Sequence, residues 1–573
     1  MTKKFLKLLF LFLAYSSLCE NTFIAINQEG YIPFGPKKFM VANTKLQKFY
    51  VKNKDGKIVY KARFIKVIDD KNSGDLVKIG DFSGITNVGE YYIELPDGTR
   101  SYTFEISSDV YKDVFKITMR SFYLQRCGVA VEGGDEKIKH EACHLEDAEF
   151  HEDVGLQGRI DVTGGWHDAG DYGKYIPNAG ITCGTLLWMW EFYEKKLENI
   201  SLDIPKIERN LPDVLEEIKY EIDWFFKMQR EDGGVYFKVA PVGFGELVLP
   251  EKDKTKRYVY KISSVATGNF VAVMAAAARV YKKYLPEYAQ KCLEAAEKGW
   301  KWLEKNPDIV PPGGFDDPAV FGAGYEGDKQ DIDERLWAAA ELFATTGEKK
   351  YNEFFIKNYT RWEPTIDYPP SWMDTHVMGM LRYLITDKGE RNVIEKIKVD
   401  LIKYADSVVD HVEKDGYRVA LKDDMYYWGS NAVALNVGVL LIFATKITKE
   451  RKYLEAAFDQ ICYILGRNSL GKCFITGLGK NPVINPHHGP SFATKTPWPG
   501  FVVGGPNENG GDDVINVIII DNPLLPKAKR YVDIDKLKAD FKKKYYGRTS
   551  YATNEPCISY NAPFQFLIAE FLD

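Results

Sequence analysis

The segment Thr267-Gly-Asn-Phe-Val-Ala-Val-Met-Ala-Ala-Ala-Ala-Arg-Val-Tyr281 is apolar along nearly all of its length. A run of this length and composition predicts an α-helix, and a helix that is apolar on most sides is an inner helix. The segment from Asp333 to Thr346 has instead a single apolar face, and Gly347 follows it as a C-terminal stop. The chain therefore contains helices of two kinds.

Residues 108–573 are expected to form one helical domain. Helical periodicity predicts twelve helices, at residues 110–126, 180–197, 212–230, 266–285, 288–305, 334–346, 350–358, 374–386, 392–414, 430–446, 451–466 and 562–572. Twelve helices of two kinds fit six hairpins, arranged as an inner ring and an outer ring. Between Gly466 and Ala562 this periodicity is lost, and a loop of that length inside a compact domain is usually functional or disordered.

The first 107 residues are organised differently. Residues 1–20 combine Lys3 and Lys4 with an apolar run and then small residues, which is typical of a secretory signal peptide. Cys19 raises the alternative of a lipid anchor, although Ser-Ser-Leu before it matches a lipidation site poorly. In residues 21–107 short β-type runs alternate with turn signals, which predicts a small all-β sandwich.

Composition limits the class of protein. The 573 residues carry a net charge of −5 with both signs interspersed, so we expect no nucleic-acid partner. After residue 20 no segment has the length and purity of a transmembrane helix, which favours a secreted, extracellular monomer without membrane contact in its mature form. Aromatic residues make up 14% of the chain and suit the faces of sugar rings. The seven cysteines besides Cys19 are scattered, which argues against a disulfide scaffold.

Three acidic residues form a candidate catalytic set. The segment Gly164-Gly-Trp-His-Asp-Ala-Gly-Asp-Tyr172 places Asp168 and Asp171 three residues apart, so both can face one cavity. Glu555 lies just before the last predicted helix. Hydrolysis of a glycosidic bond requires one carboxylic acid and one carboxylate, and this chain offers both. An Asx-rich turn and a solvated loop glutamate are the simpler alternatives.

A second constellation consists of Cys127, Cys143, His144 and His167. Two cysteines and two histidines make a complete tetrahedral set for a structural zinc ion. The gaps are longer than in a zinc finger, and buried thiols and core histidines are the alternative interpretation.

Several of these motifs together resemble glycoside hydrolase family 9. They are the glycine-rich segment with Asp168 and Asp171, the Pro486-His487-His488 element, and Thr553-Asn554-Glu555 followed by Tyr560-Asn561-Ala562-Pro563. Their order and spacing match along residues 110–573, and the preceding β-domain resembles the immunoglobulin-like module of one branch of that family. The resemblance implies an all-α (α/α)6 barrel catalytic domain preceded by a small all-β immunoglobulin-like sandwich.

The resemblance also implies an inverting β-1,4-glycan hydrolase. Asp171 would be the general base, Asp168 would help to hold the attacking water, and Glu555 would be the general acid. Glu555 must then stay protonated near neutral pH while both aspartates stay ionised. The favoured function is a secreted endo-β-1,4-glucanase, or cellulase, that degrades plant-type polysaccharide and needs no organic cofactor.

Other functions remain open at this point. The same branch includes exo-acting β-glucosaminidases and glucanases for mixed-linkage or xyloglucan chains. A non-catalytic glycan-binding protein would require lost carboxylates, and all three are present. A metal-dependent hydrolase would need a zinc ion with an open position, which four protein ligands close.

The resemblance extends to metal ions. Members of the branch carry a zinc site with residues that match Cys127, Cys143, His144 and His167, and a metal there would fix the backbone beside Asp168. Two acidic regions resemble places where family members bind calcium, with helix capping and a solvated turn as the alternatives. Their residues are Asp331, Asp333 and Glu334 in the first, and Asn507, Asp512, Asp513 and Asp533 in the second.

For substrate contact, His487 and His488 resemble the family's sugar-binding pair. Four aromatic residues are candidate stacking platforms, although each type is more often found in a core: Trp166, Tyr175, Trp428 and Trp498. The chain departs from the family at two positions, with Gly489 where an arginine is usual and Ser559 where an aspartate is usual. The loss of a planar guanidinium donor puts subsite affinity and the preferred polymer in question.

Overall fold

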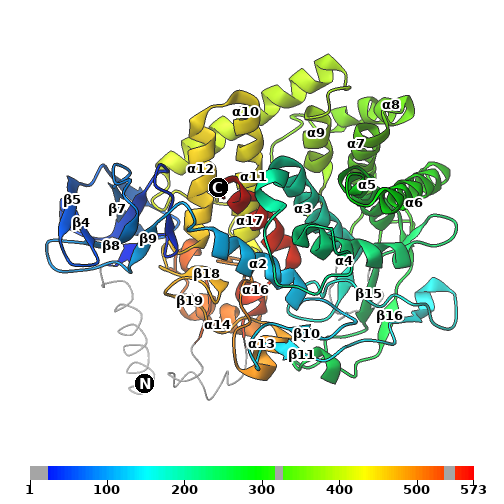
Figure 1. The fold of residues 1–573 in the computed structure, drawn as a ribbon, viewed down its shortest axis with the longest axis horizontal. Helices are drawn as coiled ribbons and strands as arrows, with labels where there is room; N and C mark the ends of the chain where they lie inside the picture. The colour runs from blue at the N-terminus through cyan, green and yellow to red at the C-terminus, as the bar shows by residue number, and fades with distance from the viewer. Residues whose placement is uncertain (1–22, 317–326, 535–548) are drawn as a thin grey trace.

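The computed structural model describes residues 23–316, 327–534 and 549–573. A β-sandwich at the N-terminal end packs against one side of a helical barrel (Figure 1). The expected signal peptide at residues 1–20, including Cys19, lies outside the described residues.

The sandwich consists of two sheets of the N-terminal region. One sheet has the order β1-β3-β7-β6, with β1 at Ile24–Ala25, β3 at Lys38–Ala42, β7 at Asp75–Asp81 and β6 at Lys66–Asp70. The other has the order β2-β9-β8-β4-β5, with β2 at Gly30–Tyr31, β9 at Phe104–Ile106, β8 at Gly89–Glu94, β4 at Lys48–Asn53 and β5 at Ile58–Arg63. Alternate side chains face inward, and the rings of Phe39 and Phe49 meet edge to face between the sheets at 4.7 Å.

Each of the twelve expected helical segments corresponds to a helix. The inner ring consists of α3 (Ile176–Leu197), α5 (Ser264–Tyr281), α7 (Ile332–Thr346), α9 (His376–Leu384), α11 (Ser430–Thr448) and α17 (Ile558–Glu570). The outer ring consists of α2 (Lys112–Leu124), α4 (Asp213–Met228), α6 (Pro286–Lys305), α8 (Lys349–Asn358), α10 (Arg391–Lys414) and α12 (Arg451–Ile464). Helices α11, α17, α3, α5, α7 and α9 follow one another in contact, and each outer helix packs on at least one inner helix. The expected (α/α)6 barrel is confirmed.

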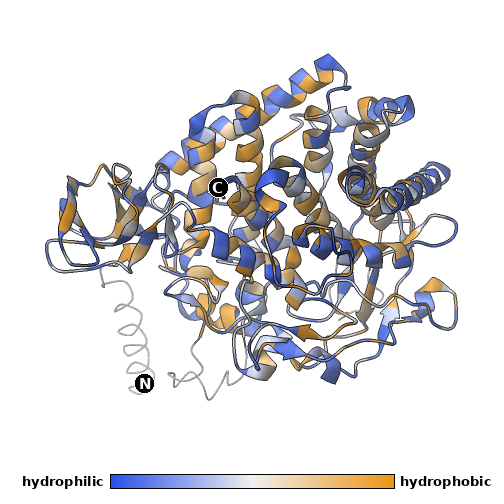
Figure 2. Ribbon diagram, in the orientation of Figure 1, coloured by the Kyte–Doolittle hydropathy of each residue, from blue (hydrophilic) through white to orange (hydrophobic). Residues whose placement is uncertain are grey.

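Burial explains which helices are inner. In α5, which contains the apolar segment quoted above, every residue except Arg279 is buried. Helix α7 is also an inner helix, with buried residues on more sides than its single apolar face predicted, and it ends at Gly347 with a φ of 73°. The outer helices α6, α8 and α10 carry long hydrophilic stretches (Figure 2).

One inner helix corrects an expectation about membranes. Among the described helices, Ser430–Thr448 is long and apolar enough to cross a bilayer, although no such segment was expected after residue 20. Most of this helix, α11, is buried inside the barrel. The apolar side chains of α11 therefore pack against the other helices of the barrel.

The aperiodic region between residues 466 and 562 contains several short elements. They are β18 (Cys473–Thr476), β19 (Pro482–Val483), α13 (Gly489–Thr494), α14 (Asp513–Asp521) and α16 (Tyr551–Asn554). On another side of the same end of the barrel lies a small sheet of order β12-β16-β15-β13, with β12 at Glu149–Phe150, β16 at Arg257–Val259, β15 at Lys238–Pro241 and β13 at Lys174–Tyr175. Of these elements, β13, β15 and α16 contribute lining residues to the cavity of the candidate site.

Candidate active site

The acidic residues meet because two inner helices are neighbours. The turn with Asp168 and Asp171 precedes β13 and α3, Glu555 precedes α17, and α3 packs on α17. The N-terminal ends of these helices therefore lie side by side. The backbone N–H of Gly170 donates to Glu555 Oε1 at 3.2 Å, across 385 residues of sequence. The N–H of Ile558 donates to the carbonyl of Asp168 at 2.9 Å.

A close backbone approach explains the glycine between the two aspartates. An ideal Cβ on Gly170 would lie 1.9 Å from the carbonyl oxygen of His487 and 3.0 Å from Glu555 Oε1. The carbonyl of Gly170 accepts a hydrogen bond from the N–H of Gly489 at 2.9 Å. Only glycine allows the turn to lie this close to both segments.

The three acids line one cavity of about 980 Å³. A volume of this size suits an extended ligand, and cavities of this kind are typical binding sites. The walls of the cavity are mainly apolar and aromatic. The carboxyl groups of Asp168, Asp171 and Glu555 are among its lining residues. This arrangement suits a neutral, polyhydroxylated substrate. Aromatic walls can pack against its sugar rings, and the carboxyl groups can act on its glycosidic bond.

Burial raises the pKa of both aspartates. The pKa of Asp168 rises to about 7, first through burial and then through repulsion from Asp171. Burial also raises the pKa of Asp171, but the Gly173 N–H and the charges of Arg257 and Lys238 oppose that rise. The surroundings of Asp168 therefore oppose the ionised state that is expected of both aspartates. Asp171 is the better candidate for a carboxylate that accepts a proton.

Asp168 is held by side chains from both helix ends. The Asn178 amide of α3 donates to Asp168 Oδ2 at 3.0 Å. The thiol of Cys557 lies 3.6 Å from each carboxyl oxygen, and its sulfur is 3.1 Å from Ser559 Oγ. Ser559, the residue at a position where aspartate is usual in the family, thus extends a polar chain through Cys557 to Asp168.

The proposed sugar-contact residues divide into two groups. Tyr175, Trp428 and His487 line the cavity, and 43% of Trp428 is exposed. Burial lowers the pKa of His487 to about 4, so its ring is neutral. Its Nδ1 lies 2.5 Å from Thr549 Oγ1, which leaves Nε2 as the nitrogen for a substrate hydroxyl.

The other three candidates are corrected by the structure. Trp166 is buried against Phe122, and its indole N–H donates to Glu217. Trp498 is fully buried, and its indole N–H donates to the carbonyl of Lys137. His488 is also buried, with its ring nitrogens 2.8 Å from Ser491 Oγ and 3.2 Å from Gln125 Oε1. None of the three lines the cavity, so they support the site from within the protein.

Sequence reasoning missed several residues of the walls. Phe244, Trp372, Met373 and Tyr551 line the cavity, and Phe244 and Met373 are more than half exposed. The ring of Tyr551 lies 5.5 Å from that of Trp428. Position relative to the inner helices could have identified some of these residues. Trp372, Met373 and Trp428 precede inner helices, as Glu555 does, and so lie at the same end of the barrel.

Gly489, where the family usually has arginine, has a structural consequence here. An ideal Cβ on Gly489 would lie 2.5 Å from the Tyr172 hydroxyl oxygen. That hydroxyl donates a hydrogen bond to the carbonyl of Val248, in the loop after β15. The absence of a side chain at residue 489 therefore leaves space for this contact.

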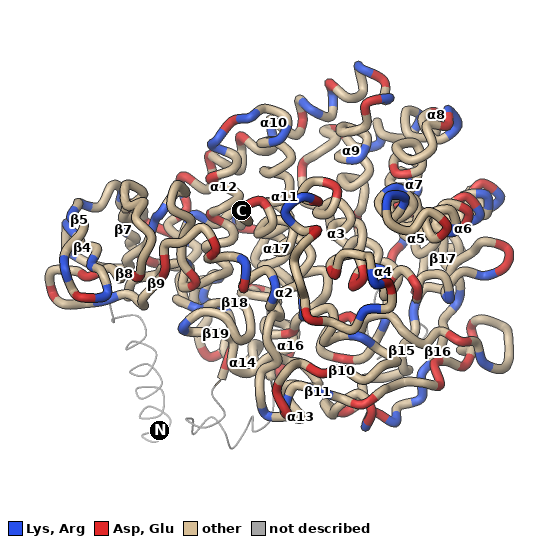
Figure 3. The backbone as a smooth tube through the Cα atoms, viewed as in Figure 1, with Lys and Arg blue, Asp and Glu red and all other residues tan. Residues whose placement is uncertain are grey.

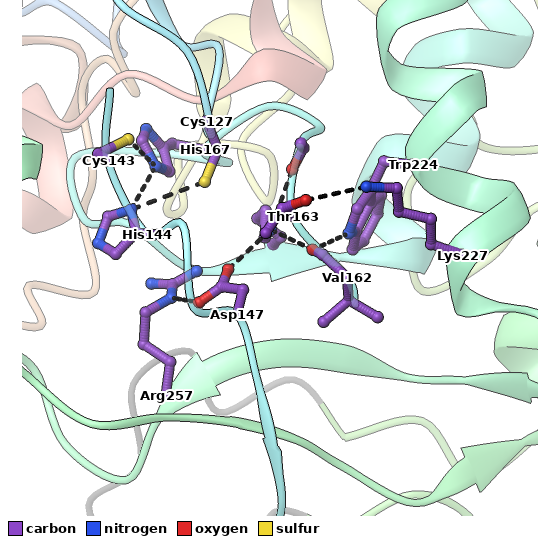
Figure 4. Close-up of polar contacts among 12 residues, drawn as sticks. Cys127, Cys143, His144, Asp147, Val162, Thr163, His167, Trp224, Lys227 and Arg257 are labelled. Carbon is purple, nitrogen blue, oxygen red and sulfur yellow. Dashed lines mark hydrogen bonds and ion pairs between the residues drawn. The ribbon is translucent and has the colours of Figure 1, made fainter. Parts of the chain in front are cut away.

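The two cysteines and two histidines converge beside the catalytic turn (Figure 4). One ligand atom from each of Cys127, Cys143, His144 and His167 lies within 4.8 Å of the others. His144 Nδ1 is 3.6 Å from Cys127 Sγ and 3.3 Å from His167 Nε2, which in turn is 3.9 Å from Cys143 Sγ. A tetrahedral zinc ion with ordinary Zn–N and Zn–S bonds separates its nitrogen ligands by about 3.4 Å and nitrogen from sulfur by about 3.6 Å. The observed spacings fit that geometry.

The electrostatics of this cluster favour a thiolate. Burial opposes ionisation of Cys127, yet the Cys143 thiol, Lys174 and the two histidines together lower its pKa well below the usual value. The pKa of Cys143 is raised, first by Cys127 and then by burial. One thiolate is thus favoured before any metal binds, and a divalent cation would stabilise the second.

The first acidic region differs in part from the expected calcium set. Asp331 pairs with Arg335 at 2.8 Å, and Asp333 accepts the N–H of Thr375. Glu334 is fully buried, and neither of its carboxyl oxygens has a hydrogen-bond partner within the described part of the chain. One oxygen of buried Asp328 is in the same situation. Glu334 and Asp328, with Asp333 beside them, are therefore the carboxyl groups that a cation would satisfy, and Asp331 is not.

In the second acidic region, as far as the structure describes it, protein donors already contact most of the expected calcium ligands. Asp512 caps α14 and accepts from Ser550, while Asp533 accepts from Ile484 and Asn485 and pairs with Lys472 at 2.7 Å. The other two expected ligands are Asn507, whose Oδ1 accepts from the N–H of Asn509 at 2.9 Å, and Asp513, which lies in the first turn of α14. Protein donors thus contact oxygens of Asp512, Asp533 and Asn507, and this region offers a cation fewer open oxygens than the first one does.

Residues of both charges are interleaved along the described backbone (Figure 3). The view shows no broad region of lysine and arginine. This distribution fits a neutral substrate better than a nucleic acid.

The chain is similar to known proteins along nearly its whole length. Residues 111–568 match the family Glycosyl hydrolase family 9, and residues 20–100 match the Cellulase N-terminal ig-like domain. The chain is 36% identical over 558 residues to Endoglucanase D of Acetivibrio thermocellus, which covers 96% of this chain and 83% of that protein. The crystal structure of GH family 9 endoglucanase J30 has 34% identity and a TM-score of 0.88, covering 95% of this chain and 99% of the other. A Zn-binding triple mutant of that endoglucanase has 35% identity and a TM-score of 0.87 over the same shares.

Proposed function

This chain belongs to glycosyl hydrolase family 9 and is an inverting glycoside hydrolase, and on that premise we propose that it is a secreted endo-β-1,4-glucanase acting on plant-type polysaccharide. The observation that supports this most strongly is the contact between Glu555 and the turn of Asp168 and Asp171 inside one aromatic cleft. The similarity to Endoglucanase D supports the choice of substrate.

In the proposed mechanism each acid has one task. Glu555 gives its proton to the glycosidic oxygen as the bond from C1 to that oxygen breaks. Asp171 takes a proton from a water molecule whose oxygen attacks C1 from the opposite face, which inverts the anomeric configuration. Asp168, held by Asn178 and Cys557, orients that water molecule. Lys238 and Arg257 favour the ionised form of Asp171 before proton transfer.

A polysaccharide panel tests this proposal. Cellulose, mixed-linkage glucan, xyloglucan and chitosan oligomers are incubated with the enzyme, and NMR identifies the anomer of the first product. We expect cleavage within β-1,4-glucan chains and a product of inverted configuration. Release of single units from chitosan oligomers would favour an exo-acting glucosaminidase instead. A retained anomer would contradict the proposed mechanism on any substrate.

We also propose that Cys127, Cys143, His144 and His167 hold a structural zinc ion, because their ligand atoms have tetrahedral spacings. The ion would link the segment before β12 to His167, whose neighbour is Asp168. Metal analysis should find about one zinc per chain, and a chelator should lower the melting temperature before it abolishes turnover. A protein purified without chelators that contains no zinc would contradict this proposal.

A calcium site is proposed around Glu334, with Asp328 and Asp333 as the other acidic ligands. Glu334 is fully buried, and burial followed by repulsion from Asp333 and Asp328 raises its pKa well above the usual value. A hard divalent cation satisfies carboxyl oxygens in such surroundings. Calcium should therefore raise the melting temperature of the wild type and not that of Glu334→Gln.

A further inference from the structure

The loop between β15 and β16, residues 242–256, forms one wall of the cleft. Phe244, Gly245, Glu246, Leu247 and Asp253 of this loop line the cavity. The side chain of Phe244 is exposed as well as lining the cavity. A loop of this length can adopt many conformations. Contacts with the rest of the protein are therefore needed to hold it in one conformation as a wall of the cleft.

One attachment is a contact to the metal cluster. Asp253 Oδ2 lies 3.4 Å from His144 Nε2, and both side chains are at least nine-tenths buried. The other oxygen of Asp253 accepts from the N–H of Thr255 at 2.9 Å and from its hydroxyl. Asp253 thus joins the fold of the loop to a residue of the cluster.

A second attachment lies nearby. The Tyr172 ring is 4.8 Å from that of His167 and 5.5 Å from that of His144, and its hydroxyl donates to the carbonyl of Val248. Gly489 leaves the space for that hydroxyl. The loop is therefore held by two contacts, one to His144 of the cluster and one to Tyr172, whose ring packs against the cluster histidines.

The two nitrogens of His144 have different partners. Nδ1 faces Cys127 and His167, and Nε2 faces Asp253. A metal ion on Nδ1 requires the ring proton to stay on Nε2, where it is donated to the carboxylate. Without a metal, only the side chains of Cys127 and His167 face Nδ1, so the ring of His144 and its contact with Asp253 are less firmly held.

We propose that Asp253 is a positioning residue through which an ion bound by Cys127, Cys143, His144 and His167 holds the 242–256 loop as a wall of the substrate cleft. This inference rests on the proposed zinc site and, for its kinetic consequence, on the proposed glucanase activity. The ion then affects substrate affinity through the loop, in addition to stabilising the fold. Asp253 touches none of the three acids in the proposed reaction, so its effect should appear in KM and not in kcat.

The test compares Asp253→Asn with the wild type, each with saturating zinc and after chelation. Hydrogen exchange of the 242–256 amides is the main readout, and α11 is the internal reference for global unfolding. In the wild type, zinc removal should speed loop exchange by about tenfold or more, whereas Asp253→Asn should exchange rapidly in both states. With zinc bound, the variant should raise KM for cellodextrins severalfold while kcat stays within about twofold.

Thr255→Val is the matched control, because it removes the other side-chain contact of Asp253 and keeps the contact to His144. It should retain the zinc dependence of loop exchange. The inference is overturned if the chain binds no metal, or if zinc removal leaves the wild-type loop unchanged. It is also overturned if Asp253→Asn keeps the zinc response. Exchange and metal analysis need no substrate, so a failure of the glucanase proposal would be seen separately, in the polysaccharide panel.

Discussion

At the scale of single residues, the site contains two aspartates, Asp168 and Asp171, whose surroundings differ. Asp168 is buried beside Asp171, and its pKa rises to about 7 for that reason. Asp171 has Lys238 and Arg257 as electrostatic partners, and it lies at the cavity surface. The sequence motif identifies both residues, but nothing in their spacing distinguishes their roles. Their unequal surroundings support Asp171 as the base.

The first prediction concerns the proposed base and acid. Asp171→Asn and Glu555→Gln should each lower kcat by about 10²- to 10⁴-fold, because each variant loses one proton-transfer group and keeps its shape. Steady-state kinetics on a soluble β-glucan measures the loss, and melting temperature checks folding. Asp161→Asn, an exposed acid upstream of the same turn, is the control and should keep wild-type turnover. Near-normal activity in either test variant would refute its assigned role.

At the scale of elements, the site lies at the N-terminal ends of the inner helices. The turn before α3, Glu555 before α17 and Trp428 before α11 gather there because the inner helices run in one ring. Helical periodicity was sufficient to predict the twelve helices. Periodicity could not identify the walls of the cavity, because loops without periodicity supply them. Nor does the sequence distinguish the buried Trp166 and Trp498 from Trp428, which lines the cavity.

The second prediction tests the close approach at the turn. Gly170→Ala should displace the turn from His487 and Glu555, because the added methyl carbon would overlap the His487 carbonyl. We expect a loss of about 1–3 kcal/mol in the free energy of unfolding, and a fall in kcat larger than the rise in KM.

Gly84→Ala in the sandwich is the matched control, since its Cβ would meet only an ordinary contact at 3.8 Å. Denaturant unfolding and kinetics of both variants provide the comparison. Equal behaviour of the two variants would mean that the turn relaxes without cost.

At the scale of the whole molecule, the sandwich and the barrel share buried polar contacts. Tyr417, in the loop after α10, donates to Asp75 of β7 at 2.9 Å, and Lys529 pairs with the same carboxylate at 2.8 Å. Beside them Asp415 accepts the N–H groups of Tyr417 and Val419. Burial, followed by repulsion from Asp70 of the sandwich, raises the pKa of Asp415 to about 8. The interface therefore encloses a carboxyl group that the fold favours in its protonated form.

The third prediction follows from that pKa. A carboxyl group has a pKa of about 4 when unfolded, so the stability that protonated Asp415 contributes is complete below about pH 4 and is lost as pH rises through 8. The free energy of unfolding should fall with pH between about 5 and 8 by up to roughly 1.4 kcal/mol per unit from this group. Asp415→Asn should flatten that dependence and be the more stable protein at pH 8.

Denaturant unfolding at several pH values measures both slopes. Asp55→Asn, an exposed position in the same sandwich, is the control and should keep the wild-type slope. Parallel slopes for wild type and Asp415→Asn would show that Asp415 does not titrate as its burial requires.

The sequence by itself determined the class of the fold, because burial of apolar helices is a local and periodic property that composition records. It also identified the three acids and the four cysteine and histidine residues, since their chemistry depends on residue type. Only the tertiary structure decided which histidine and which tryptophans reach the cleft, and that an aspartate of the second acidic region caps a helix. It also decided that both carboxyl oxygens of Glu334 and one oxygen of Asp328 are buried without a hydrogen-bond partner within the described residues. These outcomes depend on which donors and rings approach from segments hundreds of residues away, as Glu555 approaches Gly170, and no local pattern records such an approach.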